Sequence, residues 1–226
     1  DALATEARAA GANLDLLVDA DELDRIGEII ARGERLRLLN GRMHREMMDE
    51  VRWNARDVAS TRDGLDVATL ELTPTDLAGM RLVSTWTLMD LVGKLGLGRG
   101  LERPSRKAVA SASAVGLLTA PGRGKSDWFH GGRALERVWL RSTGMSLAFQ
   151  PMTPLLYLFA RVDAGAAGEL SGAESRELAE LQAQFAELFP RRGGANLMLF
   201  RLSRASPPTA RSLRLPVDDV LRIERD

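Results

Sequence analysis

The chain has 226 residues, with 31 basic and 31 acidic side chains and no cysteine. Its length is enough to bury a core of its own, and its balanced charge provides no overall field that would attract nucleic acid or an anionic membrane. The absence of cysteine excludes disulfides, thiolate catalysis and cysteine-ligated metal or iron–sulfur sites.

Membrane and targeting signals are missing from the sequence. No apolar stretch approaches the roughly 20 residues that cross a bilayer, and the N-terminus has neither the basic region nor the apolar core of a signal peptide. We therefore expect a cytoplasmic protein that binds neither membranes nor nucleic acid. Because the sequence starts at Asp1 within a helical pattern, we also expect it to be the C-terminal part of a longer protein.

The first half of the sequence predicts mainly helices. A short buried strand is expected over residues 14–18, followed by Asp19, whose side chain can cap a helix. Residues 54–74 lack periodicity and are expected to be irregular. The helices, predicted by apolar spacing of three and four, cover residues 1–10, 22–31, 36–53 and 75–95.

The second half alternates strands with helices. Strands are predicted over residues 111–118 and 195–202, and helices over 131–144 and 171–189. The helix at 131–144 is expected to begin at its Gly-Gly pair and to end at Gly144. These elements predict an α+β fold, with a mixed central sheet flanked by helices and an extended C-terminal arm. We expect residues 1–226 to form a single domain.

The segment QPMTP, residues 150–154, follows this second-half helix. Pro151 and Pro154 have no N–H to donate, so the segment is expected to be irregular. From the residues alone, an ordinary corner between helices and a ligand-binding turn both fit it.

The sequence TAPGRGKS, residues 119–126, comes close to a phosphate-binding P-loop. The motif requires glycine five residues before its Gly-Lys pair, where this chain has Thr119. The glycines at 131 and 132 are also expected to interrupt the helix that a P-loop needs. We therefore reject this motif.

The two histidines give little support to a metal site. Residues three and four positions after His44 are methionines, so a solvated helix face is expected there. His130 is expected in a loop beside Trp128 and Phe129, where packing within the loop is the ordinary role.

Arg211 and Arg214 lie on the arm between prolines. A guanidinium on a stiff segment matches the oxygens of a phosphate, although surface solubility would also explain both residues.

Several of these pieces stand in the order seen in the nitroreductase-like flavoprotein family. They are the strand SASAVGLL, the helix that opens GGRAL, the proline turn after Gly144, the strand NLMLFRL and the arm R-x-x-R-x-P. The chain most resembles a divergent bacterial branch, in which two such halves lie in tandem or the fold is fused to an adenylyltransferase-like domain. The family's N-terminal Arg-x-Ser-x-Arg motif is missing from this sequence.

This resemblance implies a nitroreductase-like fold that binds FMN. Gln150, Pro151, Met152 and Thr153 match the segment against the isoalloxazine ring, and Arg211 and Arg214 match the arm that reaches the FMN phosphate. The implied activity is that of an NAD(P)H-dependent oxidoreductase acting on a small-molecule electron acceptor, with no catalytic side chain or metal assigned. The resemblance also implies a dimer, or pairing with a second nitroreductase-like half. The alternative is a degenerate module that sequesters flavin or serves assembly in a larger protein.

Overall fold

The computed structural model describes residues 2–165, 170–190 and 193–223. The chain divides into two compact units. The first unit comprises Asp1–Leu38 and Gly96–Ala205, and the second comprises Leu39–Leu95 and Ser206–Asp226.

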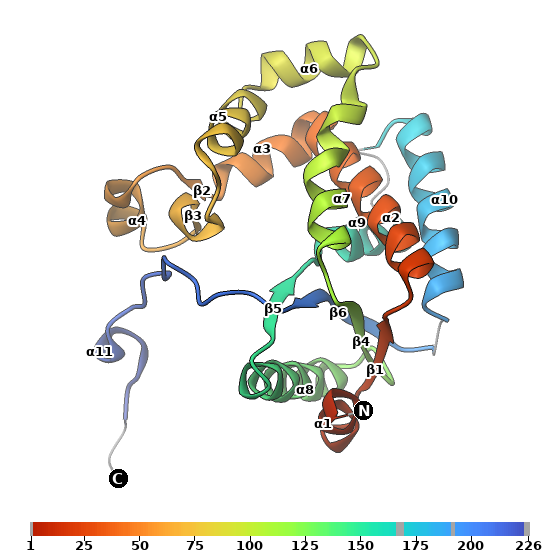
Figure 1. The fold of residues 1–226 in the computed structure, drawn as a ribbon, viewed down its shortest axis with the longest axis vertical. Helices are drawn as coiled ribbons and strands as arrows, with labels where there is room; N and C mark the ends of the chain where they lie inside the picture. The colour runs from red at the N-terminus through yellow and green to blue at the C-terminus, as the bar shows by residue number, and fades with distance from the viewer. Residues whose placement is uncertain (1, 166–169, 191–192, 224–226) are drawn as a thin grey trace. The chain divides into compact units, whose positions relative to one another are not determined.

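A four-stranded sheet forms the centre of the first unit (Figure 1). Its strands, in spatial order, are β1 (Asn13–Leu17), β4 (Ala114–Ala120), β6 (Ala195–Ser203) and β5 (Ala148–Pro151). The α+β class is thereby confirmed. The expectation of a mixed sheet is wrong, because each strand of this sheet runs opposite to its neighbours.

Helices lie on both sides of this sheet. Helices α1 and α8 cover one face, and α2, α9 and α10 lie on the other side (Figure 1). The helical elements of this unit are α1 (Ala2–Ala9), α2 (Ala20–Leu39, whose last residue enters the second unit), the 3-10 helix η2 (Gly98–Glu102), α7 (Arg103–Ala110), α8 (Lys125–Gly144), α9 (Pro154–Asp163) and α10 (Gly172–Leu188).

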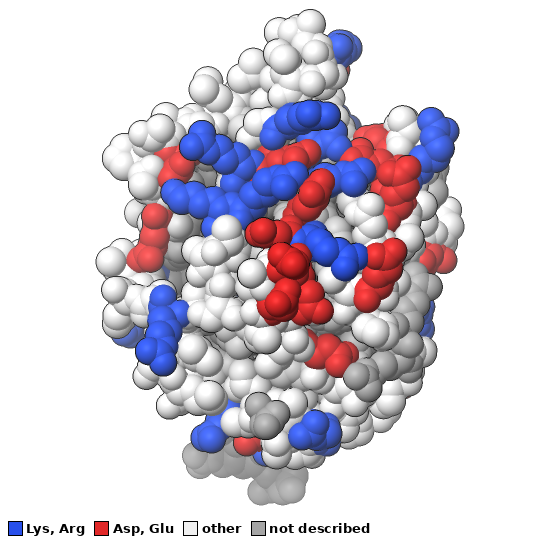
Figure 2. All heavy atoms as spheres, turned by 45° about the vertical axis from the view of Figure 1, so that its right-hand side comes forward, with Lys and Arg blue, Asp and Glu red and all other residues white. Residues whose placement is uncertain are grey.

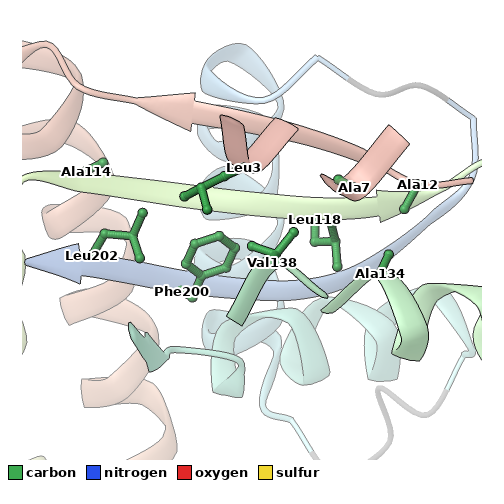
Figure 3. Packing of buried hydrophobic residues seen from close by; sticks show 9 residues of the cluster. All are labelled: Leu3, Ala7, Ala12, Ala114, Leu118, Ala134, Val138, Phe200 and Leu202. Atoms are coloured by element: carbon green, nitrogen blue, oxygen red, sulfur yellow. The ribbon is translucent and has the colours of Figure 1, made fainter. Parts of the chain in front are cut away.

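One buried apolar cluster fills the space between the sheet, α1 and α8. Phe200 of β6 and Leu118 of β4 lie beside Val138 of α8 and Leu3 of α1 (Figure 3). A Cβ atom on Gly116 would lie 2.5 Å from the Phe200 ring, so the close approach of this ring to β4 requires glycine. The cluster consists of Leu3, Ala7, Ala12, Ala114, Leu118, Ala134, Val138, Phe200 and Leu202.

Helix α8 begins six residues earlier than its glycines suggest. It starts at Lys125 and passes through Gly131 and Gly132, so the expected start at this pair is wrong. A Cβ atom on Gly131 would lie 2.5 Å from the side chain of Leu197. This glycine therefore allows β6 to pack closely against the helix. The expected end at Gly144 is confirmed.

Ion pairs join α2 to its neighbours on the other side of the sheet. Arg35 contacts Glu102 at 2.9 Å and also pairs with Glu177, and all three side chains are mostly buried. Arg32 adds a second contact to Glu177 at 3.0 Å. Among the described side chains, acidic and basic groups are interspersed on the face shown in Figure 2, and neither sign dominates it.

The second unit consists of short elements with few buried apolar residues. They are α3 (Gly41–Asp49), β2 (Val51–Arg52), α4 (Ala55–Thr61), β3 (Leu65–Asp66), the 3-10 helix η1 (Val67–Leu70), α5 (Pro74–Val83), α6 (Trp86–Lys94) and α11 (Val217–Val220). The long helices expected over 36–53 and 75–95 are each broken. Asn40 accepts hydrogen bonds from the Arg42 and Met43 amides, which stops α2 and starts α3.

His44 lies inside the second unit, not on a solvated helix face as expected. The residue is 1% exposed, and the centroid of its ring lies 5.4 Å from that of Trp86. Nε2 lies 2.7 Å from the Val83 carbonyl oxygen, so this nitrogen carries the proton and donates. His44 therefore has a structural role, because it packs where α3 contacts α6.

Candidate functional site

The segment Gln150–Thr153 connects the edge of the sheet to a helix. Gln150 and Pro151 belong to β5, and α9 begins at Pro154, so only the middle of the segment is irregular. Pro151 is tolerated because β5 is an edge strand. The Met152 amide donates to the Leu199 carbonyl at 2.7 Å, which fixes the turn against β6.

Arg201 fixes the side chain of Gln150. The two residues are cross-strand partners, and Arg201 Nε donates to Gln150 Oε1 at 2.6 Å. Because a guanidinium only donates, the atom of the glutamine that faces it must be the oxygen. The Gln150 NH2 group is therefore left to donate elsewhere, on the exposed side of the segment.

Arg201 is itself held by the end of α7. Its Nη1 donates to the hydroxyl of Ser111 at 3.0 Å and also to the Ala108 carbonyl. Partial burial lowers the pKa of the Arg201 guanidinium. Arg201 is not among the residues predicted from the sequence, although an arginine within the apolar run NLMLFRL is a signal that could reveal it.

The arm that carries Arg211 and Arg214 is attached to the second unit at two points. Thr209 donates its amide and its hydroxyl to the Glu71 carboxylate, with a hydroxyl distance of 2.6 Å. These hydrogen bonds lower the pKa of Glu71. Farther along, Asp219 pairs with Arg62. The two arginines thus lie between two anchored positions.

Both arginines of the arm are exposed and have no carboxylate partner within the described chain. Arg214 donates only weakly, from Nη1 to the carbonyls of Ser212 and Leu213 at 3.4 and 3.3 Å. Gln150–Thr153 belong to the first unit and the arginines to the second, so the residues predicted from the sequence are divided between the two.

The rejected P-loop sequence connects β4 directly to the long helix α8. The expectation of an interrupted helix was therefore wrong, and that reason for rejecting the motif falls away. The other reason stands, because Thr119 occupies the place of the motif's first glycine. Asp127 also accepts a hydrogen bond from the Gly124 amide at 2.9 Å, so a carboxylate already caps the start of the helix.

His130 lies in α8, not in a loop as expected. Its Nδ1 is 3.3 Å from the Ser126 hydroxyl, and both side chains are exposed. Among the described residues, no carboxylate or carbonyl contact orients this ring as a catalytic base would require, and its other close neighbour is the Phe129 ring, at 5.7 Å between centroids. Within the described residues no group of three or more potential metal ligands occurs, and no helix is long and apolar enough to cross a membrane.

Comparison with known proteins gives one relative. It is a protein of Mycobacterium tuberculosis (strain CDC 1551 / Oshkosh) described as Uncharacterized protein MT1398, to which the chain is 36% identical over 217 residues. The match covers 94% of this chain but only 29% of the relative's length. No protein-family profile matches the sequence, and no solved structure matches it.

Proposed function

We propose that this chain is an FMN-binding, nitroreductase-like domain. In this proposal it passes hydride from NAD(P)H through the flavin to a small-molecule acceptor such as a nitro compound or a quinone. The observation that carries the proposal is the fixed Gln150 amide, which presents a hydrogen-bond donor where the sheet edge meets α9. Because NAD(P)H is the reductant, the cytoplasm is the compartment that this activity requires.

Each of the two sets of predicted residues has the chemistry that one end of FMN requires. A flat ring with carbonyl and nitrogen acceptors suits the Gln150 NH2 group and the adjoining Pro151, Met152 and Thr153. A phosphate suits Arg211 and Arg214, which carry uncompensated positive charge on an anchored arm. When bound, the flavin supplies the redox chemistry, and the protein binds and orients it.

Titration with FMN tests the proposal directly. We expect the protein to quench FMN fluorescence at a single site, and Arg214→Ala to weaken that affinity at least about tenfold, since a charge-assisted bond is lost. Arg222→Ala, on the same exposed arm, is the matched control and should leave the affinity unchanged. A protein that leaves FMN fluorescence unchanged would contradict the proposal.

Gln150→Ala tests the ring segment separately from the phosphate arm. Loss of the donor should weaken the affinity for FMN and for riboflavin by similar factors, because both share the ring. Arg214→Ala should weaken only the binding of FMN. If Gln150→Ala leaves both affinities unchanged, the ring lies elsewhere.

A flavin-sequestering or assembly module is the second candidate. This chain spans only 29% of the length of its mycobacterial relative. A protein of that full length has room for other domains or for a second nitroreductase-like half, which favours this candidate. Anaerobic addition of NADPH or NADH distinguishes the candidates. Bleaching of the visible absorption band of the bound flavin indicates an enzyme, whereas bound flavin that stays yellow indicates sequestration.

A further inference from the structure

The first unit contains a cavity of about 490 Å³ on the side of the sheet that carries α9 and α10. This volume lies within the range of sites for small molecules, about 300 to 1,000 Å³. Leu117 and Thr119 of β4 line it, whereas Leu118, between them, faces the cluster beside α8. The cavity and that cluster therefore lie on opposite faces of the sheet.

Three phenylalanines form an aromatic wall of this cavity. The Phe159 and Phe185 rings meet edge to face, with centroids 5.4 Å apart, and Phe189 lies 5.0 Å from Phe185. All three side chains are at most 4% exposed, so the wall is fixed by packing. Such a wall suits a flat apolar group.

A change of register between β4 and β6 brings polar groups to the cavity. Leu118 pairs with Met198, but Thr119 pairs with Asn196, so Leu197 is an extra residue in β6. Leu197 and Met198 both pack towards the cluster beside α8, and Asn196 lines the cavity instead. Bulges of this kind often redirect side chains next to functional sites.

The hydroxyl of Thr119 has no hydrogen-bond partner within the described chain. The residue is 7% exposed and its Oγ1 is buried. Leaving a buried hydroxyl unsatisfied is costly, so natural structures rarely keep one without a reason. A ligand atom in the cavity would supply the missing partner.

Arg123 brings a positively charged side chain to the cavity. Its Nε donates to the Gly194 carbonyl at 3.3 Å, and it forms no ion pair with the described residues. Asp163, the acidic residue of the lining, accepts a hydrogen bond from Gln182 at 3.1 Å. Neither group has a charged partner among the described residues, but the Asp163 carboxylate is held by the Gln182 amide, and Arg123 is the cation that an anionic ligand can reach.

We infer that this cavity is a binding site for a small aromatic carboxylate. The ring lies against Phe159 and Phe185, the carboxylate pairs with Arg123, and the Thr119 hydroxyl donates to the ligand. This site is separate from the proposed flavin segment. Pro151 pairs with Phe200, and Asn196 lies four residues back along β6, roughly 13 Å away at the rise of a strand.

Binding of 2-naphthoate to the purified chain tests this inference, with uncharged 2-naphthalenemethanol as the matched ligand. By calorimetry we expect naphthoate to saturate one site and the alcohol to bind at least about tenfold more weakly, because it lacks the charge-assisted bond. Equal affinities, or no saturable binding of naphthoate, would overturn the inference.

Variants locate the binding. Arg123→Gln should remove the preference for naphthoate over the alcohol. Arg133→Gln, which changes an exposed arginine of α8, should preserve that preference. Ala186→Phe adds a ring to the lining and should abolish binding of both compounds while far-UV circular dichroism stays unchanged. A folded Ala186→Phe protein that binds naphthoate normally would show that the compound binds elsewhere.

Competition with FMN separates this inference from the proposed function. Naphthoate affinity should be the same with and without saturating FMN, and naphthoate should bind even if the chain takes up no flavin. Displacement of naphthoate by FMN would place both at one site and would contradict a separate cavity.

Discussion

The two units of this chain are stabilised in different ways. In the first, large apolar side chains such as Phe200, Leu118 and Val138 are fully buried around a sheet. In the second, helix α5 has no buried residue at all, and hydrogen-bonded caps and charged contacts define the short elements. Asn40, Asn54 and Thr73 each cap a helix there.

This difference has consequences for how each unit responds to its surroundings. Apolar burial depends little on pH and on salt, whereas exposed ion pairs are screened by salt and are lost when a carboxylate is protonated. Arg52, for example, binds Asp63 at 2.7 Å and lowers the pKa of that carboxyl. We therefore expect the first unit to respond to loss of volume and the second to loss of polar contacts.

The largest expected effect comes from emptying the centre of the first unit. Phe200→Ala should lower the free energy of unfolding by about 3–5 kcal/mol, because a buried ring is replaced by a cavity. Urea denaturation measures this change. Phe129→Ala is the control, since Phe129 is 67% exposed on α8 and should change stability by less than about 0.5 kcal/mol. Similar losses for both variants would mean that the cluster around Phe200 is not the core.

In the second unit, the strongest single contribution is expected from His44. His44→Ala removes its packing on Trp86 and leaves the Val83 carbonyl without its donor, at a cost of about 2 kcal/mol. His130→Ala, which changes the other histidine of the chain at an exposed position, should be nearly neutral. Denaturation followed by tryptophan fluorescence compares the two, and equal stabilities would argue against a structural role for His44.

Thr119 breaks the apolar pattern of the first unit, and its replacement sharpens the comparison. Thr119→Val keeps the shape and removes the unsatisfied hydroxyl, so we expect unfolding to become about 1 kcal/mol less favourable. Thr143→Val, on the exposed side of α8, is the control and should not stabilise the protein. A destabilised Thr119→Val protein would mean that the hydroxyl has a partner in the free protein.

Much of the first unit could be predicted from the sequence because local patterns specify it. Strands β1, β4 and β6 lie close to the expected residues, and Asp19 accepts hydrogen bonds from the amides at the start of α2, as expected. Continuous apolar runs and caps are local signals, so these elements were found without knowledge of the tertiary contacts.

Other features of the fold could not be predicted because they depend on contacts between distant residues. Gly131 looked like a helix start because nothing near it in the sequence explains a glycine there. The side chain that requires it, Leu197, lies 66 positions farther along the chain. The change of register opposite Thr119 depends on which residues of β4 and β6 pair. The hydrogen bond from Arg201 to Gln150 depends on the pairing of β5 with β6. Propensity and periodicity carry no information about such pairings.

The smallest expected effect on overall stability, and the most specific to the second unit, is the release of its arm by acid. Thr209 donates two hydrogen bonds to Glu71 and lowers the pKa of that carboxyl in the folded state. The attachment is therefore complete above the ordinary carboxylate pKa, about 4, and is lost as pH falls through the lowered value. We expect the Thr209 amide signal in NMR spectra to shift towards its unfolded position over that pH range. Glu71→Gln should weaken the attachment even at about pH 7, where the wild-type carboxylate is ionised.

The stability of the Phe200 core should not change in the Glu71→Gln variant, because Glu71 and Thr209 belong to the second unit. A Thr209 signal that is the same at neutral and acid pH would show that this contact does not hold the arm.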